Sequence, residues 1–388
     1  MPHDAPTVRF HIRMSERFRI AVIPGDGIGK EVMPEGLCAL DAAGARFGIT
    51  LDYQHIDWAS CDHYARTGSM MPEDWKAQLA GVDAIYFGAV GWPATVPDHV
   101  SLWGSLLKFR REFDQYINLR PAITFEGVKC PLAGRKPGEI DMLIVRENTE
   151  GEYTAVGGTM FDGTERELVM QQAIFTRHGS DRVLRYAFNA AMQRQRRHVT
   201  VATKSNGIAI SMPWWDQRAA AIAAEFPEVQ WDKQHIDILC ARFVLQPQCF
   251  DVVVATNLFG DILSDLGPAC TGTIGLAPSG NLNPERRFPS LFEPVHGSAP
   301  DIAGRNLANP VAMIWSGAMM LDFLGRGTGA GRAAHDAIVS AIRQVLVNGP
   351  HTADLGGRAS TKDMGEAIAS AITSGADARA ARHGDSSR

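Results

Sequence analysis

Apolar residues form short unbroken runs along this chain, and each run is bounded by polar residues or glycine. Residues 252–255 (VVVA) are one such run, and residues 83–91 (DAIYFGAVG) contain another. A run of this length is typical of a strand buried on both faces, as in parallel sheets that helices cover. Helical segments alternate with these strands. The pattern predicts an α/β fold with a mostly parallel sheet flanked by helices.

The segment after residues 252–255 carries two aspartates. Gly260 predicts the turn between the strand and a helix that bears Asp261 and Asp265. Side chains four residues apart project from one helix face, so both carboxylates can bind one cation. Hard oxygen ligands favour Mg2+ or Mn2+. The alternative is an N-cap aspartate with a solvated neighbour, and the segment by itself does not decide between them.

Residues 19–32 (RIAVIPGDGIGKEV) predict a strand, a glycine-rich turn and a helix. The spacing from Gly25 to Lys30 is one residue short of a Walker A loop, and Glu31 follows where Ser or Thr is needed. The glycines also fail the spacing of the dinucleotide-binding fingerprint. They indicate that the backbone approaches another group closely, or that the turn is simply tight.

Basic residues gather before the middle of the chain. Arg110, Arg111 and Arg120 are close in sequence, and Arg146 follows in the segment VRENTEGEY. Guanidinium groups hold carboxylates in planar, bidentate pairs, so several arginines in one pocket favour a di- or tricarboxylic acid as ligand. Each arginine taken alone is better explained as a surface residue.

Three further polar side chains have both a bland and a functional interpretation. Tyr153 is either a core phenol or a proton donor. Lys204 follows a β-branched strand, where a lowered pKa would make it a base, although a snorkelling lysine is commoner. Asp237 lies in an apolar segment (HIDILCARFV), where an unpaired carboxylate is costly. A metal shared with Asp261 and Asp265 would provide the partner that Asp237 needs.

The remaining segments predict a loop, a buried helix and two frayed ends. Residues 291–310 are rich in Gly, Pro and Asn and predict a long functional loop. Residues 309–325 predict a helix that is apolar nearly all round and lies in the core or at a subunit interface. Residues 1–13 and 374–388 predict disordered ends, with Met14 as an alternative start.

Composition narrows the class of protein. A length of 388 residues exceeds what one core usually supports, so two domains are expected. A net charge of −5 gives no basic field that would attract nucleic acid or an anionic membrane. The six scattered cysteines favour free thiols in a reducing cytoplasm. No apolar run predicts a membrane span or a signal peptide.

Several motifs occur in a characteristic order: GDGIG, NLRP, VRENTEGEY, TKSN, NLFGDILSDL and HGSAPDIAG. In this respect the chain resembles the β-decarboxylating 2-hydroxyacid dehydrogenases, over about residues 19–370. The segments WASCDHY, FGAVGWP and SLWGSLLKFRREFDQYINLRP are most similar to the branch that acts on tartrate and D-malate. The resemblance implies NAD-dependent oxidation and β-decarboxylation of D-malate to pyruvate and CO2, or oxidation of tartrate.

The resemblance also implies an architecture. The family has a two-domain α/β fold without the usual Rossmann fingerprint, in agreement with the glycine spacing above. Residues 1–115 and 272–388 would form the discontinuous NAD-binding domain, and residues 116–271 the second domain. The family works as a homodimer in which both subunits build each site.

Residue roles follow from the same resemblance. Lys204, from the partner subunit, would be the base, and Tyr153 the proton donor. NAD, Mg2+ or Mn2+, and K+ are the implied cofactors. The substrate-binding residues would be Arg110, Arg120, Arg146 and Leu106, and the metal ligands Asp237 (from the partner), Asp261 and Asp265. The cofactor-binding residues would be Asn206, His296, Gly297, Ser298, Ala299, Asp301, Ile302 and Asn309.

Four positions bear on selectivity within the family. Asp301 resembles the NAD-selecting members, in which a carboxylate accepts from the ribose hydroxyls and would repel a 2′-phosphate. Gly104 and Leu106 stand where isocitrate enzymes offer Ser and Asn to a third carboxylate, so isocitrate should be a poor substrate. Trp103 stands where isopropylmalate enzymes have Glu, and its ring should fill the space that an isopropyl group needs.

Three alternatives remain on sequence grounds. The first is a P-loop-type phosphotransferase, against which the missing Ser or Thr argues. A second is a non-catalytic metal-binding or NAD-binding protein, which would retain Asp261 and Asp265 without Lys204 or Tyr153; all four are present. Within the enzyme class the alternative is 3-isopropylmalate dehydrogenase.

Overall fold

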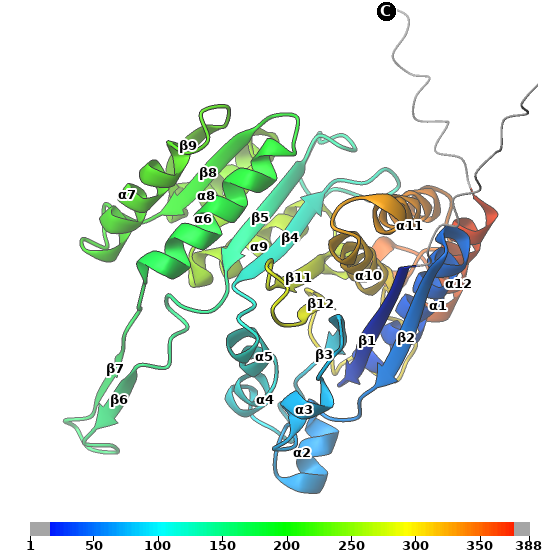
Figure 1. Ribbon diagram of the computed structural model, residues 1–388, viewed down its shortest axis with the longest axis horizontal. Coiled ribbons are helices and arrows are strands. Elements are labelled where there is room, and N and C mark those ends of the chain that lie inside the picture. The colour runs from blue at the N-terminus through cyan, green and yellow to red at the C-terminus, as the bar shows by residue number, and fades with distance from the viewer. Residues whose placement is uncertain (1–15, 376–388) are drawn as a thin grey trace, which may run out of the picture.

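The computed structural model describes residues 16–375, so Met14, residues 1–13 and almost all of residues 374–388 lie outside the described part. A single large sheet runs through the molecule, with helices packed against it (Figure 1). Its ten strands have the order β2-β1-β3-β12-β11-β4-β5-β10-β8-β9. These strands are β1 (Glu16–Gly25), β2 (Ile49–His55), β3 (Ala84–Ala89), β4 (Ile117–Ile123), β5 (Asp141–Glu147), β8 (His198–Thr203), β9 (Gln230–His235), β10 (Val252–Ala255), β11 (Pro278–Leu282) and β12 (Ser290–Pro294).

Most strand pairs in this sheet are parallel. The antiparallel pairs are β12 with β11, β11 with β4, and β4 with β5, which lie together in the middle. A short connection joins β11 to β12, and a connection of that length permits only an antiparallel pair. Elsewhere helices join the parallel strands, so the predicted α/β class with a mostly parallel sheet is confirmed.

The helices range in length from four to 20 residues. The helices are α1 (Gly29–Phe47), α2 (Cys61–Thr67), α3 (Trp75–Gln78), α4 (Asp98–Gly104), α5 (Leu106–Glu112), α6 (Arg177–Met192), α7 (Ser211–Ala223), α8 (Ile236–Leu245), α9 (Asn257–Thr271), α10 (Val311–Leu324), α11 (Gly329–Asn348) and α12 (Thr361–Ser374). No helix in the described residues is both long and apolar enough to cross a membrane.

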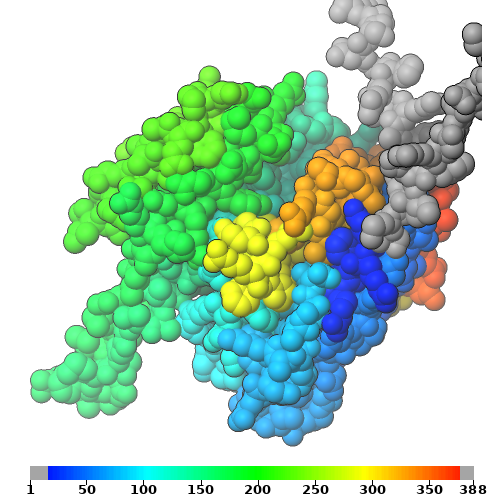
Figure 2. Space-filling view, viewed as in Figure 1, coloured from blue at the N-terminus to red at the C-terminus, as the bar shows by residue number. Residues whose placement is uncertain are grey.

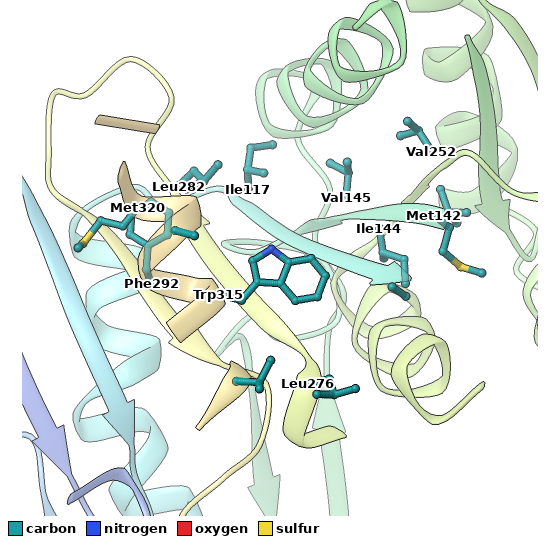
Figure 3. Packing of buried hydrophobic residues seen from close by; sticks show 14 of the residues in the cluster. Ile117, Met142, Ile144, Val145, Val252, Leu276, Leu282, Phe292, Trp315 and Met320 are labelled. Carbon is teal, nitrogen blue, oxygen red and sulfur yellow. The ribbon is translucent and has the colours of Figure 1, made fainter. Parts of the chain in front are cut away.

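Helix α10 lies in the core, as its apolar sequence predicts. Nearly every residue from Val311 to Leu324 is buried, and the helix packs against α1, α11 and β12. Figure 3 shows the indole of Trp315 among Phe292, Leu276 and Ile144, which come from different parts of the chain. This cluster joins the strands in the middle of the sheet to the helices that cover them.

The boundaries of two predicted elements are wrong. Gly260 is not a turn, because α9 begins at Asn257 and Gly260 lies inside the helix. The predicted loop at residues 291–310 begins too early, because Ser290–Pro294 forms β12. In both cases a buried neighbour decides the outcome, since β12 pairs with β3 and Gly260 packs against Arg146.

A two-stranded hairpin, β6 (Gly157–Met160) and β7 (Leu168–Gln171), projects from the body of the molecule (Figures 1 and 2). Met160, Val169 and Met170 on this hairpin are exposed.

The division of the chain into two domains, residues 1–115 with 272–388 and residues 116–271, stays a prediction. The six cysteines are free, as predicted.

Candidate active site

The site lies where parallel strands β5 and β10 end. Arg146 near the end of β5 is in register with Ala255, the last residue of β10, and α9 begins two residues later. In open α/β sheets ligands bind beyond the carboxyl ends of the strands. This arrangement brings Arg146 next to the first turns of α9.

Arg146 is almost completely buried and is held by α9. Its Nε and Nη2 atoms donate to Asn257 Oδ1 at 3.1 and 2.8 Å, and Nη1 forms an ion pair with Asp261. A Cβ at Gly260 would lie 2.5 Å from Arg146 Cγ. Glycine is therefore needed inside this helix because the arginine side chain lies directly against its backbone.

Arg120 reaches the same helix face from β4. It is buried, and its Nη1 donates to Ser264 Oγ at 2.7 Å and to Asp265 Oδ1 at 3.2 Å. Asn257, Asp261, Ser264 and Asp265 thus form one polar face of α9. Asp261 is the fifth residue of this helix, so the N-cap interpretation is wrong. Extending the helical spacing from the two aspartates would have found Asn257 and Ser264 in the sequence.

Arg110, on α5, is the third buried arginine. Its Nη2 lies 3.3 Å from Glu293 Oε1, and Glu293 also accepts from Asn281 at 2.7 Å. Glu293 was not predicted as a site residue, although it follows Leu291 and Phe292, and a carboxylate among apolar residues needs a partner just as was argued for Asp237. Burial and then repulsion from Arg146 and Arg110 lower the pKa of Arg120 to about 10. The structure therefore brings Arg110, Arg120 and Arg146 together.

These arginines retain unused hydrogen-bond donors. The Nε atoms of Arg110 and Arg120 are buried and have no partner among the described residues. An unsatisfied buried donor is costly, and the cost is larger when the donor is charged. An anionic ligand would supply the missing acceptors only after these side chains turn toward it, because neither Nε atom is exposed.

Tyr153 lies beside Asp261 and Arg146. Its hydroxyl donates to Asp261 Oδ2 at 2.7 Å, and Arg146 Cζ lies 5.3 Å from its ring centroid. Burial, followed by the hydrogen bond to Asp261, raises the pKa of Tyr153, so the phenol keeps its proton. Burial acts to raise the pKa of Asp261, but the arginines and this hydrogen bond outweigh it, and the net pKa is lowered.

Lys204 and Asp237 form a separate pair in the single chain. Lys204 directly follows β8, and its Nζ lies 2.7 Å from Asp237 Oδ1 at the start of α8. The Asp237 side chain is 65% exposed, so the expectation of a costly apolar environment is wrong for one chain. Within residues 16–375 of one chain, no three potential metal ligands come together. In one chain Asp237 therefore stays apart from Asp261 and Asp265.

The predicted cofactor loop follows β12. Ile28 N donates to Ser298 O at 2.9 Å, and a Cβ at Gly27 would lie 2.0 Å from that oxygen. The group that the glycine-rich turn approaches is therefore the chain's own loop. His296 is buried, its Nε2 has no partner among the described residues, and burial lowers its pKa. This unpaired Nε2 atom is buried, so a ligand would reach it only after the loop moves.

The other predicted cofactor residues have different surroundings. Asn309 uses both amide atoms within the fold, because Nδ2 donates to Asp354 and Oδ1 accepts from Val311 N. Asn206 follows β8, which four strands separate from β12, so one chain does not bring it to the loop. The remaining predicted cofactor residues lie in one loop that follows β12, and Asp301 among them is exposed. They are Gly297, Ser298, Ala299, Asp301 and Ile302.

Comparison with known proteins places the chain in a family. Residues 19–368 match the family model described as isocitrate/isopropylmalate dehydrogenase. The chain belongs to that family. It is 65% identical over 359 residues to the D-malate dehydrogenase [decarboxylating] of Escherichia coli (strain K12), covering 92% of this chain and 99% of that enzyme.

Two further comparisons agree with this family assignment. The tartrate dehydrogenase/decarboxylase of Pseudomonas putida is 65% identical over 356 residues, 92% of this chain and 98% of that enzyme. The crystal structure of isocitrate dehydrogenase from Methylococcus capsulatus matches with a TM-score of 0.80 and 32% identity, over 92% of this chain and 99% of that one. The chain is therefore a dehydrogenase of the isocitrate/isopropylmalate dehydrogenase family.

In this dehydrogenase the α4–α5 corner lies beside the arginines. Leu106, the first residue of α5, is buried, and a Cβ at Gly104 would lie 2.8 Å from Met70 Cγ. Trp103 is 38% exposed, and its ring lies over the guanidinium of Arg111. Arg111 itself donates to the Tyr153 carbonyl. The arginine cluster predicted from the sequence thus divides, with Arg111 outside the group that Arg110 and Arg120 form.

Proposed function

We propose that this enzyme oxidises and β-decarboxylates a small 2-hydroxy dicarboxylic acid with NAD, and that D-malate and tartrate are its substrates. The observation that carries the proposal is the set of three buried guanidinium groups next to Asp261 and Tyr153. Buried arginines with unused donors suit the two carboxylates of such an acid. The names of the two relatives with 65% identity support the same substrates.

The proposed proton transfers divide between two residues. Lys204 of a second copy removes the proton of the hydroxyl on carbon 2 as hydride leaves that carbon for NAD. The bond between carbons 3 and 4 then breaks, CO2 leaves, and the bonding electron pair stays on the remaining enolate. Tyr153, which keeps its proton because its pKa is raised, donates that proton to carbon 3 and so forms pyruvate.

The carboxylates of α9 fit a divalent cation. Asp261 and Asp265 present hard oxygen donors from one helix face, and Asp237 of a second copy would complete the set. Bound Mg2+ or Mn2+ would polarise the substrate's carbon 2 oxygen. Arg146, Arg120 and Tyr153 now occupy the oxygens of the two aspartates, so they orient both carboxylates before a substrate binds.

We attribute the selectivity for cofactor and substrate to side chains of the loop after β12 and of the α4–α5 corner. We propose that Asp301 accepts hydrogen bonds from the adenosine ribose of NAD and repels the 2′-phosphate of NADP. Gly104 and Leu106 offer no hydrogen-bonding side chain to a third substrate carboxylate, and the Trp103 ring takes up room that a branched group needs. Overpacking a defined pocket costs about 1–3 kcal/mol, so D-malate should be preferred to 3-isopropylmalate by roughly ten- to a hundredfold.

A steady-state substrate screen tests this proposal. Purified enzyme is assayed with D-malate, L-tartrate, meso-tartrate, 3-isopropylmalate and isocitrate, each with NAD or NADP in the presence of Mn2+ and K+. The expected result is the highest kcat/KM for D-malate or a tartrate with NAD. A higher kcat/KM for 3-isopropylmalate or for NADP would contradict it.

A further inference from the structure

Tyr153 is held at both ends of the residue. Its hydroxyl donates to Asp261, and its backbone carbonyl accepts from Arg111 Nη2 at 2.6 Å. The ring of Trp103 lies over the same guanidinium, with Arg111 Cζ 4.1 Å from the ring centroid. Trp103 at the end of α4 and Arg111 on α5 therefore form a support beneath the Tyr153 backbone.

This support uses properties that only arginine combines. A guanidinium is planar, so its face can stack on an aromatic ring while its edge donates a hydrogen bond. Arg111 has no carboxylate partner within residues 16–375, whereas the neighbouring Arg110 has Glu293. Burial lowers the pKa of Arg111. The Tyr153 carbonyl and the Trp103 ring are thus the groups that stabilise the guanidinium.

Helix α5 connects two parts of the site through consecutive residues. Arg110 points to Glu293 and the other buried arginines, and Arg111 points to the loop of Tyr153. Consecutive side chains of a helix project about 100° apart, so one short helix can serve both directions. The same loop is tied on its other side, where the Thr154 hydroxyl has two acceptors for its one proton, Gly151 O at 2.9 Å and Gln172 O at 2.5 Å.

We infer that Arg111 and Trp103 are positioning residues that set the orientation of Tyr153 toward the substrate. The inference rests on the proposed function, in which Tyr153 protonates the enolate. Arg111 acts through the Tyr153 backbone, and Trp103 acts through Arg111. For D-malate, which has no branched group to place beside Trp103, loss of either residue lowers kcat more than it changes KM, because the substrate-binding arginines keep their own partners.

A double-mutant cycle tests the inference. Arg111→Met is expected to lower kcat for D-malate about tenfold in the otherwise unchanged enzyme, since small misplacements of a catalytic group are costly. In a Tyr153→Phe background the same substitution should lower kcat less than about twofold, because the hydroxyl that Arg111 orients is gone. Trp103→Leu should lower kcat in both backgrounds as Arg111→Met does. Trp103→Phe, which keeps a stacking ring, should retain most of the activity.

The chain offers a matched control on the same helix. Lys108 Nζ lies 5.6 Å from the centroid of the Trp75 ring, so Lys108→Met also removes a cation stacked on tryptophan from α5. Lys108→Met should leave kcat and KM unchanged. Thermal unfolding verifies that each variant is folded, and Arg111→Lys, which keeps the charge, provides a second variant if Arg111→Met unfolds.

The possible outcomes are distinct. Equal loss of kcat from Arg111→Met in both backgrounds would overturn the inference, because Arg111 would then act independently of Tyr153. Unchanged kcat in Arg111→Met would overturn it as well. Failure of the proposed function has another signature, since Tyr153→Phe alone would then turn over D-malate at the wild-type rate.

Discussion

The charged side chains of this site are buried, but each has a charged or polar partner. Arg146 is 1% exposed, yet it has Asn257 and Asp261 as partners, and Arg120 has Ser264 and Asp265. Removing one partner of a buried pair leaves an uncompensated charge, which costs more than the pair contributes. The same groups therefore determine both substrate binding and local stability.

Asp261→Asn separates the role of this aspartate in turnover from its role in local stability. The variant keeps a side chain of the same size beside Arg146 and Tyr153 but loses the negative charge. We expect kcat to fall by about a hundredfold or more while the fold and NAD binding persist, as for the loss of one electrostatic group in a site. Steady-state kinetics with a Mn2+ titration measures this. Normal turnover with an unchanged metal requirement would show that Asp261 is structural.

Glu147 gives a stability prediction with a definite sign. It is buried at the end of β5, and burial raises its pKa to about 7 although Thr149 and Glu150 donate to it. Between about pH 4.5 and 7 the unfolded chain loses this proton while the folded chain keeps it. The free energy of unfolding therefore falls as pH rises through that window, by up to about 3 kcal/mol from this group.

Glu147→Gln isolates that contribution, because the amide does not titrate. Urea unfolding of both proteins at several pH values measures it. The wild type should lose stability relative to the variant as pH rises from 5 to 7. Parallel stability curves would show that the carboxyl group titrates normally in the folded state.

At the scale of elements, the sequence predicts the type of each segment more accurately than its boundaries. The runs that predict β10 and α10 are correct because burial alone decides them. The position of Gly260 and the start of the loop after β12 depend on partners far away in sequence, Arg146 and β3. Such contacts leave no local pattern, which is also why Arg111 was not assigned its role.

The turn between β1 and α1 supports the predicted cofactor loop. Gly27 has a positive φ of 53°, and a Cβ there would lie 2.0 Å from Ser298 O. Gly27→Ala should push this loop away, raising KM for NAD about tenfold or more while KM for D-malate changes little. Gly134→Ala is the matched control, since Gly134 also has a positive φ, of 74°, but its Cβ would meet nothing within 4 Å. Equal effects of both substitutions on KM for NAD would refute the link between turn and loop.

At the scale of the whole molecule, one chain holds two incomplete sets of residues. Asp261 and Tyr153 lie with the arginines, whereas Lys204 is paired with Asp237. The projecting β6–β7 hairpin exposes Met160 and other apolar side chains that a second copy could cover (Figure 2). Both observations support the proposed homodimer with shared sites.

Mixed dimers test the sharing of sites. Lys204→Met and Asp261→Asn should each be nearly inactive alone. After the two variants are unfolded together and refolded, a mixed dimer has one site with both Lys204 and Asp261 intact. About a quarter of wild-type activity should return, because half the dimers are mixed and each has one working site of two. No recovery in dimers shown to be mixed would mean that each chain builds its own site.

The central claim is that oxidation at carbon 2 and loss of the β-carboxylate occur in one catalytic cycle. D-malate labelled with 13C in the carboxyl group at carbon 4 follows both events, with NADH measured by absorbance and labelled CO2 by mass spectrometry. We predict one labelled CO2 and one unlabelled pyruvate for each NADH formed. Labelled oxaloacetate accumulating in step with NADH would contradict the account.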